Sequence, residues 1–332
     1  MADFRVGLIG CGGFAHTHAR IIADLPQSDL VACCDTERQR AEAYSQLYAG
    51  GKAKVFTSFE RMFDQVKMDI VYICLPPFAH TNEVELAAER GIHIFIEKPI
   101  ARTMAVANRM VRAVRKAGVK SQVGFMLRFA GAVEVVKEEL DSGRAGPPAL
   151  FSGRYYCNAL HAPWWRDKSK SGGQVVEQII HIYDLCRYLL GRPQTVYCQQ
   201  RNLFHRDVPG YTVEDVSAST IAFENGALAS IVGTNNAIPN RWLSYVDLVT
   251  ERRSVHFTDG NHAAVHYTDS PAPTEVTIAS DKDGYRGETL DLLDAIQTGG
   301  ETRTPISEGA ETLRLVLAAD RSAQRGEPVK LA

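Results

Sequence analysis

Long apolar segments are absent from this sequence of 332 residues. No apolar run approaches the about 20 residues that a membrane-spanning helix requires. The first residues also lack a basic segment followed by an apolar core, which is the pattern of a secretion signal. We therefore expect no membrane role and a cytoplasmic location.

An excess of charge of one sign and metal-binding cysteine pairs are absent as well. The formal net charge is −2, so the chain offers no basic surface to a nucleic acid. The seven cysteines include no Cys-x-x-Cys pair and are odd in number, which favours free thiols in a reducing compartment over disulfides or a metal site. Cys11 has redox sensitivity as an alternative role, because a helix N-terminus lowers the pKa of a thiol.

The composition is that of a soluble globular protein, with 45% hydrophobic and 23% charged residues, and the length allows two domains. In residues 1–124, short apolar runs alternate with helical stretches. This pattern predicts an α/β domain of the Rossmann type, with a doubly wound parallel sheet covered on both faces. In residues 125–332, longer runs joined by turns predict an α+β domain with a large open, mostly antiparallel sheet.

The predicted strands cover residues 4–9, 30–34, 70–75, 93–96, 120–125, 149–157, 195–203, 216–223, 228–235, 244–248 and 254–257. The predicted helices cover residues 14–25, 37–48, 79–90, 103–117, 287–297 and 308–324. A further helix is expected in the segment GGQVVEQIIHIYDLCRYLLG.

The first strand ends in a glycine turn that is typical of nucleotide binding. In its GxGxxA pattern, the backbone at Gly10 and Gly12 can approach a pyrophosphate, and the small Ala15 lets the next helix pack close to the strand. The alternative is that the glycines serve only a tight turn. The residues predicted to hold the cofactor here are Gly10, Cys11, Gly12, Gly13, Phe14 and Ala15.

Asp35 ends the second predicted strand, close to the spacing at which an acidic residue meets the adenosine ribose of a dinucleotide. A carboxylate there accepts hydrogen bonds from the ribose hydroxyls and repels a 2′-phosphate. We therefore expect NAD, while the nearby Arg38 keeps NADP possible. The alternative for Asp35 is a cap of the following helix.

Two further strand ends carry candidate residues, because ligands of such sheets bind beyond the carboxyl ends of the strands. Leu75 and Pro76 end one strand and direct the chain toward the cofactor, with His80 after them. The alternative is that the proline only separates the strand from the following helix. Glu97 and Lys98 directly follow the apolar run HIFI, and solvated charges are the alternative to a catalytic pair.

The combination of GCGGFA, Asp35, the EKP that closes the fifth strand and GGQVVEQIIHIYDLCRYLLG resembles the Gfo/Idh/MocA family, which includes glucose-fructose oxidoreductase and inositol dehydrogenase. The resemblance extends over nearly the whole chain, to AADRSAQRGEPVKL. It implies hydride transfer between NAD(P) and a secondary alcohol of a sugar, polyol or inositol-like substrate. It also implies a homodimer or homotetramer formed through the outer face of the C-terminal sheet.

The resemblance also implies roles for single residues. Lys98 takes the place of the family's lysine beside the nicotinamide and the substrate oxygen, and His181 takes the proton-transfer role of a helical motif written DxGxH. We expect Lys98 and His181 to converge on one nicotinamide ring. Here the motif reads EQIIH, with Glu177 for the aspartate and Ile179 for the glycine. The isoleucine predicts a helix that begins earlier, or a backbone that needs no positive φ.

Glu177 has three possible tasks: to orient His181, to hold a sugar hydroxyl, or to share the proton transfer. An ordinary helix ion pair is the alternative for Glu177 and His181, and a metal site that includes Asp184 is not favoured, because no third convincing ligand is present.

The segment NALHAPWWRDKSKSGGQ precedes that helix and contains aromatic and arginine side chains that suit the wall of a polyol pocket. Contacts between subunits are the alternative for Trp164 and Trp165. For Arg128, which resembles an arginine of the family near the domain junction, the alternative is a salt bridge that fixes the domains. The residues predicted to contact substrate are Arg128, Tyr156, Trp165, Arg166, Glu177 and His181.

Two other functions are compatible with this sequence. One is an enzyme that uses bound NAD in an internal cycle of oxidation and reduction, leading to epimerisation, elimination or glycoside cleavage. The other is a non-catalytic regulator that senses a nucleotide. The presence of both Lys98 and His181 argues against the regulator, whereas the internal cycle stays open.

Overall fold

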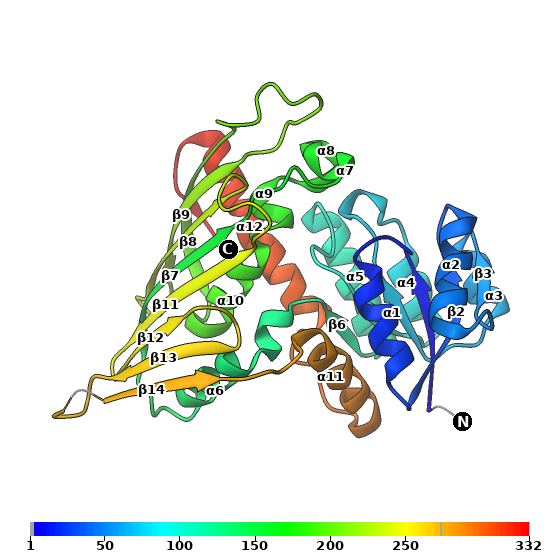
Figure 1. Ribbon diagram of the computed structural model, residues 1–332, viewed down its shortest axis with the longest axis horizontal. Helices are drawn as coiled ribbons and strands as arrows, with labels where there is room; N and C mark the ends of the chain where they lie inside the picture. Colours follow the sequence, from blue (N-terminus) through cyan, green and yellow to red (C-terminus); the bar gives the residue numbers. More distant parts are fainter. Residues whose placement is uncertain (1–2, 273, 332) are drawn as a thin grey trace. The chain divides into compact units, whose positions relative to one another are not determined.

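The computed structural model describes residues 3–272 and 274–331 and divides into two compact units (Figure 1). The first unit comprises residues 1–124 and 285–310, and the second comprises 125–284 and 311–332. The division expected from the sequence differs in residues 285–310, which were assigned to the second domain. The reason is that Leu292 and Leu293 of helix α11 (Gly284–Thr298) are part of the apolar core around β1 and α1.

The first unit contains six parallel strands in the order β3-β2-β1-β4-β5-β6, which confirms the predicted Rossmann-type sheet. The strands are β1 Phe4–Ile9, β2 Ser28–Cys34, β3 Lys54–Phe56, β4 Ile70–Ile73, β5 His93–Ile96 and β6 Ser121–Val123. The helices are α1 Ala15–Asp24, α2 Arg38–Ala49, α3 Phe59–Gln65, α4 Glu83–Glu89 and α5 Met104–Ala117.

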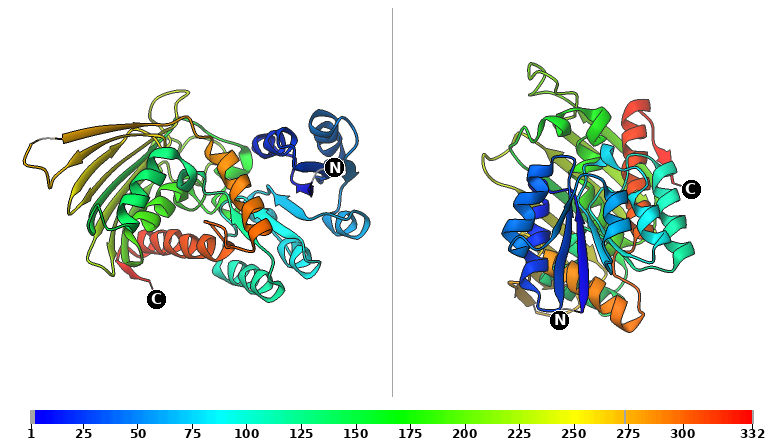
Figure 2. Two further views of the ribbon diagram at one scale, coloured as in Figure 1. Left: turned by 90° about the horizontal axis from the view of Figure 1, so that it is seen from below. Right: turned by 90° about the vertical axis from the view of Figure 1, so that its right-hand side faces the viewer.

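Helices lie on both sides of this sheet (Figure 2, right-hand view). Strands β4 and β5 are almost wholly buried, as expected for central strands covered on both faces. The strand order reverses beside β1, which lies between β2 and β4. In such sheets a crevice for ligands forms at this reversal, beyond the carboxyl ends of the strands.

One predicted helix of the first unit begins later than expected. Residues 79–90 were predicted as helical, but a separate 3₁₀ turn occupies Pro77–Ala79 and α4 begins only at Glu83. The carboxylate of Glu83 accepts the backbone N–H of Thr81 at 2.8 Å, which fixes the bend between the two helical pieces.

The second unit contains nine strands in the order β14-β13-β12-β11-β7-β10-β9-β8-β15. Every neighbouring pair is antiparallel except β7 and β10, which confirms the predicted mostly antiparallel sheet. The strands are β7 Pro148–Tyr156, β8 Pro193–Arg201, β9 Val216–Phe223, β10 Leu228–Thr234, β11 Leu243–Thr250, β12 Arg253–Phe257, β13 His262–Tyr267, β14 Thr274–Ala279 and β15 Val329–Lys330. The helices are α6 Gly131–Asp141, α7 Pro163–Arg166, α8 Lys168–Ser171, α9 Gln174–Glu177, α10 Ile180–Leu190 and α12 Ile306–Arg325, the last of which begins in the first unit.

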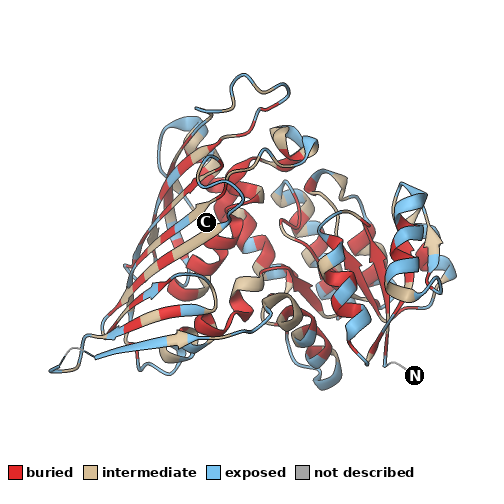
Figure 3. Cartoon of the chain, in the orientation of Figure 1, coloured by how far each residue is buried: buried red, intermediate tan, exposed pale blue. Residues whose placement is uncertain are grey.

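Helices α6, α10 and α12 lie on one side of this sheet (Figures 1 and 2). Burial alternates along the strands accordingly, as in β9, where Ser219 and Ile221 are buried and Ala218 and Thr220 are exposed (Figure 3). A turn at Glu224-Asn225-Gly226 joins β9 to β10. In the described part of the chain, no helix is long and apolar enough to cross a membrane.

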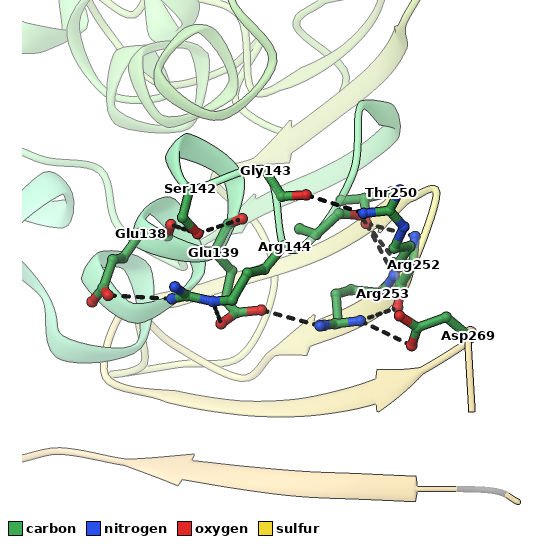
Figure 4. Close-up of polar contacts among 10 residues, drawn as sticks. Glu138, Glu139, Ser142, Gly143, Arg144, Thr250, Arg252, Arg253 and Asp269 are labelled. Carbon is green, nitrogen blue, oxygen red and sulfur yellow. Dashed lines mark hydrogen bonds and ion pairs between the residues drawn. The ribbon is translucent and has the colours of Figure 1, made fainter.

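A polar network attaches the end of α6 to the hairpin of β11 and β12 (Figure 4). The guanidinium of Arg253 donates to Glu139 at 3.2 Å and to Asp269 at 3.1 Å, and Arg144 donates to Glu139 at 2.6 Å. The hydroxyl of Thr250 donates to a backbone carbonyl after α6 at 2.6 Å. These bonds fix α6 over the inner face of strands β12 to β14.

Candidate functional site

The glycine turn after β1 presents an open backbone. Gly10 has φ of +86°, and a Cβ there would lie 2.4 Å from the carbonyl oxygen of Cys74, so only glycine fits. At Gly12 and Gly13, by contrast, a Cβ would meet no atom within 4 Å. Helix α1 begins at Ala15, directly after the turn, and the N-terminal end of a helix dipole attracts negative charge. This arrangement is suited to a phosphate group.

Asp35 is in contact with this turn. One carboxylate oxygen accepts the N–H of Cys11 at 2.9 Å and the other accepts the N–H of Glu37 at 2.8 Å. The N-cap of α2 is Glu37, so Asp35 is not the cap considered as the alternative. Each carboxylate oxygen keeps a further lone pair with which it can accept a ribose hydroxyl. Arg38, which kept NADP possible, pairs with Glu42 at 2.8 Å.

The pKa of the Cys11 thiol differs from the expectation. Cys11 is 3% exposed, and a hydrogen bond with Cys33 together with burial raises the pKa of the thiol above its usual value. The expected lowering by the helix N-terminus is therefore wrong, because desolvation disfavours the thiolate. The structure favours a packing role for this side chain.

The strand end after β4 contains a buried histidine. Nδ1 of His80 lies 2.6 Å from Oε1 of Glu83, and both side chains are almost fully buried. Burial tends to raise the pKa of the Glu83 carboxyl, but its hydrogen bonds with His80 and Thr81 outweigh this and lower it. Nε2 of His80 is buried without a hydrogen-bond partner among the described residues. A buried polar atom in this state can bond to a ligand or to a water molecule.

These residues fit a bound dinucleotide. The open backbone of the glycine turn suits the pyrophosphate, Asp35 suits the adenosine ribose, and the orphan nitrogen of His80 lies after the neighbouring strand. Leu75 and Pro76 form the chain between β4 and His80, where the Cδ2 atom of Leu75 approaches Gly10.

Glu97 and Lys98 follow β5 at the same edge of the sheet. The register aligns Ile9, Ile73 and Ile96 in neighbouring strands, so the glycine turn and Glu97 are two strands apart, about 10 Å at the usual strand spacing. Glu97 is 7% exposed and its carboxylate pairs with a histidine of α1. Lys98 is half-buried, and the peptide bond that follows it is cis.

The helix expected around His181 is interrupted in the structure. Helix α9 ends at Glu177 and α10 begins at Ile180, with the N–H of Ile182 bonded to the carbonyl of Ile179. Ile179 has φ of −77°, which agrees with the expectation that the backbone here needs no positive φ. Glu177 and His181 are therefore on different helices, and the continuous helical face assumed from their spacing is wrong.

Glu177 is held by Trp165 instead. The indole Nε1–H of Trp165 donates to Oε2 of Glu177 at 2.6 Å. Trp165 is 2% exposed and packs with Tyr211 and Val213. This tryptophan is thus a buried support of Glu177, and its expected place in the wall of a polyol pocket stays a prediction.

His181 is 9% exposed, in the first turn of α10, with the ring of Phe125 edge-on at 6.3 Å. Nearby in sequence, Nε2 of Gln178 lies 3.0 Å from Nε2 of His161, and its Oε1 is buried with no hydrogen-bond partner in the described chain. The ring of His161 lies 4.4 Å from Trp165, so the helix start and the aromatic loop form one cluster.

The two predicted substrate arginines make protein contacts. Arg128 is 2% exposed and donates to both oxygens of Asp184, at 2.8 and 2.7 Å, in a salt bridge within the second unit. Arg166 donates to the carbonyls of Leu160 and His161, at 2.9 and 3.0 Å, and so closes its own loop. Tyr156 ends β7 and is half-buried.

A metal site is not formed by these residues, because Asp184 is paired with Arg128. Across the described ranges, no three His, Cys, Asp or Glu side chains gather as metal ligands would.

Sequence reasoning missed His18, Gln178, His161 and Trp242. His18 and Gln178 are next to recognised motifs, and a polar residue in an apolar stretch was the signal that could have found them. Trp242 is 55% exposed and its ring meets that of His161 edge-on at 6.4 Å. It follows a stretch without periodicity, so no sequence signal connected it with the site.

A parallel sheet with a glycine turn and an acidic residue at the end of the second strand defines a protein that binds a dinucleotide. The chain belongs to the Gfo/Idh/MocA family: the model of the oxidoreductase family with an NAD-binding Rossmann fold matches residues 4–125, and that of the GFO/IDH/MocA C-terminal domain matches residues 133–262. The resemblance inferred from the sequence is confirmed. The protein is an NAD-dependent oxidoreductase.

The chain is 28% identical to the uncharacterized oxidoreductase YrbE of Bacillus subtilis (strain 168), over 98% of this chain and 96% of that protein. It is 30% identical to D-glucoside 3-dehydrogenase of Escherichia coli (strain K12), over 68% of this chain and 69% of that protein. Among solved structures, levoglucosan dehydrogenase in complex with NADH and L-sorbose has the same fold, with a TM-score of 0.92, 22% identity and coverage of 100% of both chains.

Proposed function

We propose that this protein transfers a hydride between NAD and a secondary alcohol of a sugar, polyol or inositol-like compound. The observation that carries the proposal is the position of Lys98, which follows β5 at the edge where the glycine turn and the orphan nitrogen of His80 also lie. The relatives that act on glucosides and levoglucosan support the substrate class.

The proposed roles follow from what alcohol oxidation requires. Bound NAD would supply the hydride acceptor, held by the glycine turn and Asp35. Lys98 stabilises the alcohol oxygen as negative charge develops on it, and His181 takes the hydroxyl proton. Glu177, fixed by Trp165, holds the substrate or His181 in a defined orientation.

The test is the substitution Lys98→Ala, with Lys116→Ala, an exposed lysine of α5, as the control. We expect Lys98→Ala to bind NAD as the unchanged protein does in calorimetry, and to lower turnover by about 100-fold or more. The control retains its turnover. Unchanged turnover in Lys98→Ala would remove Lys98 from the mechanism.

The substrate class is tested by supplying polyols, aldoses, inositols and glycosides and recording NADH absorbance. Formation of NADH in step with product supports net dehydrogenation. Product without net NADH would instead support the internal cycle of oxidation and reduction.

We also propose a cytoplasmic location and assembly into a homodimer or homotetramer through the outer face of the nine-stranded sheet. The seven cysteines are all free, which suits a reducing compartment. The outer face presents Leu150 and Leu228 side by side in β7 and β10, each about half exposed. An exposed apolar row of this kind is typical of a contact surface.

A further inference from the structure

His18 is a fully buried polar residue in α1, the helix that follows the glycine turn. It is 0% exposed, and its Nε2 lies 2.6 Å from Oε1 of Glu97, beyond the end of β5. The other carboxylate oxygen of Glu97 accepts the backbone N–H of Lys98 at 3.1 Å. A chain of two hydrogen bonds therefore joins α1 to the backbone of Lys98.

The surrounding residues restrict the movement of the side chains that form these two hydrogen bonds. The ring of His18 lies 4.6 Å from Phe95 and 5.7 Å from Tyr72, and Nδ1 has no hydrogen-bond partner in the part of the chain that the structure describes. A Cβ at Gly124 would lie 2.8 Å from Oε1 of Glu97, so the carboxylate rests directly on that backbone. The carboxylate thus contacts both an imidazole and a glycine.

Packing alone does not account for a histidine here. An apolar side chain would fill the space among Phe95, Tyr72 and Tyr285 without leaving Nδ1 unsatisfied, which costs free energy. The imidazole is needed for its N–H, because a buried carboxylate that loses its partner is strongly destabilised. The histidine therefore serves Glu97.

We propose that His18 is a positioning residue for Lys98: through Glu97 it fixes the start of the Lys98 backbone relative to the helix that receives the cofactor pyrophosphate. This inference rests on the proposed role of Lys98. Its physical basis is that a displacement of about 1 Å between a catalytic group and the reacting atoms lowers the rate by up to about 100-fold.

The experiment compares His18→Gln with His18→Asn. The amide nitrogen of glutamine can occupy the position of Nε2 and donate to Glu97, whereas that of asparagine is one bond too short. We expect His18→Gln to keep most of its turnover and His18→Asn to lower kcat by about 10-fold to 100-fold, with the KM for the alcohol and the Kd for NAD changed less than threefold. Equal kcat values in the two folded variants would overturn the inference.

A double-mutant cycle with Lys98→Ala separates this inference from the proposed function. If His18 acts through Lys98, His18→Asn lowers kcat in the native background but not in the Lys98→Ala background. An equal loss in both backgrounds would show a merely structural role. Retained turnover in Lys98→Ala alone would instead remove Lys98 from the mechanism, whereas no NADH formation by the native protein with any of the alcohols tested would refute the proposed function.

Glu97→Met covers the case in which His18→Asn does not fold. It removes both acceptor oxygens but keeps a side chain of similar length, and we expect the same fall in kcat with unchanged NAD binding. A kcat equal to that of the native enzyme would overturn the inference, because the chain from His18 to Lys98 passes through this carboxylate.

Discussion

At the scale of single residues, the bond between Trp165 and Glu177 determines how the departure from the family motif is accommodated. Glutamate is one methylene longer than aspartate, and its carboxylate meets the indole N–H at 2.6 Å. A hydrogen bond to a charged group contributes about 1.5–3 kcal/mol. We therefore interpret Trp165 and Glu177 as one unit, in which the tryptophan fixes the longer side chain.

Trp165→Phe tests this unit, since it keeps the aromatic packing and removes the N–H donor. We expect a loss of about 1.5–3 kcal/mol in the free energy of unfolding by urea, together with a fall in kcat. If Glu177→Gln costs as much kcat in the Trp165→Phe background as in the native one, the two residues act independently.

Candidate residues whose positions follow from the direction of the strands alone could be predicted from the sequence. The cofactor turn, Asp35 and Lys98 each stand where a buried strand ends, and parallel strands bring their carboxyl ends to one edge. The partners of Arg128 and Trp165 were not predicted, because Asp184 and Glu177 are 56 and 12 residues away along the chain. Hydrophobic periodicity carries no information about such pairings.

At the scale of secondary-structure elements, local sequence patterns were again predictive, whereas features that depend on tertiary pairing were missed. Strands β1, β5 and β9 have the predicted bounds, since each apolar or alternating run is flanked by clear turn residues. Strands β13 (HAAVHY) and β14 (TEVTIA) were missed: their short alternation of small and polar residues is stabilised by pairing with β12 and with each other. Local propensity is weak there, and tertiary context decides.

Ile179, in the interruption between α9 and α10, packs against Gly233 of β10. A Cβ on Gly233 of β10 would lie 1.9 Å from Cδ1 of Ile179, which is 1% exposed. The isoleucine that replaces the family's glycine thus fits because the facing strand carries a glycine. The sequence could not show this relation, because the two residues are far apart along the chain.

We expect Gly233→Ala to lower the free energy of unfolding by about 1–3 kcal/mol through overpacking. Ile179→Ala should cost about 2–5 kcal/mol through the cavity it leaves. The double variant should cost less than the sum, because the new methyl group occupies part of that cavity. Urea denaturation of the four proteins measures this, and simple additivity would contradict the proposed contact.

At the scale of the whole molecule, the outer face of the nine-stranded sheet is not covered by any helix of the second unit, among the residues that the structure describes. Leu150 is paired in register with Leu228 on one side and with Val249 on the other, so the three side chains form a row across β10, β7 and β11. Leu150 is 46% and Leu228 is 51% exposed. Apolar side chains aligned in this way favour contact with another apolar surface over contact with water.

The proposed oligomer therefore depends on this row. We expect Leu150→Glu combined with Leu228→Glu to lower the molar mass measured by light scattering to that of the monomer, because each buried carboxylate would lack a partner in the interface. Leu47→Glu, on α2 and 65% exposed, is the control and should leave the mass unchanged. A native protein that is already monomeric, or a double variant that keeps the native mass, would refute assembly through this face. NAD binding should survive in the double variant, since the glycine turn and Asp35 belong to the other compact unit.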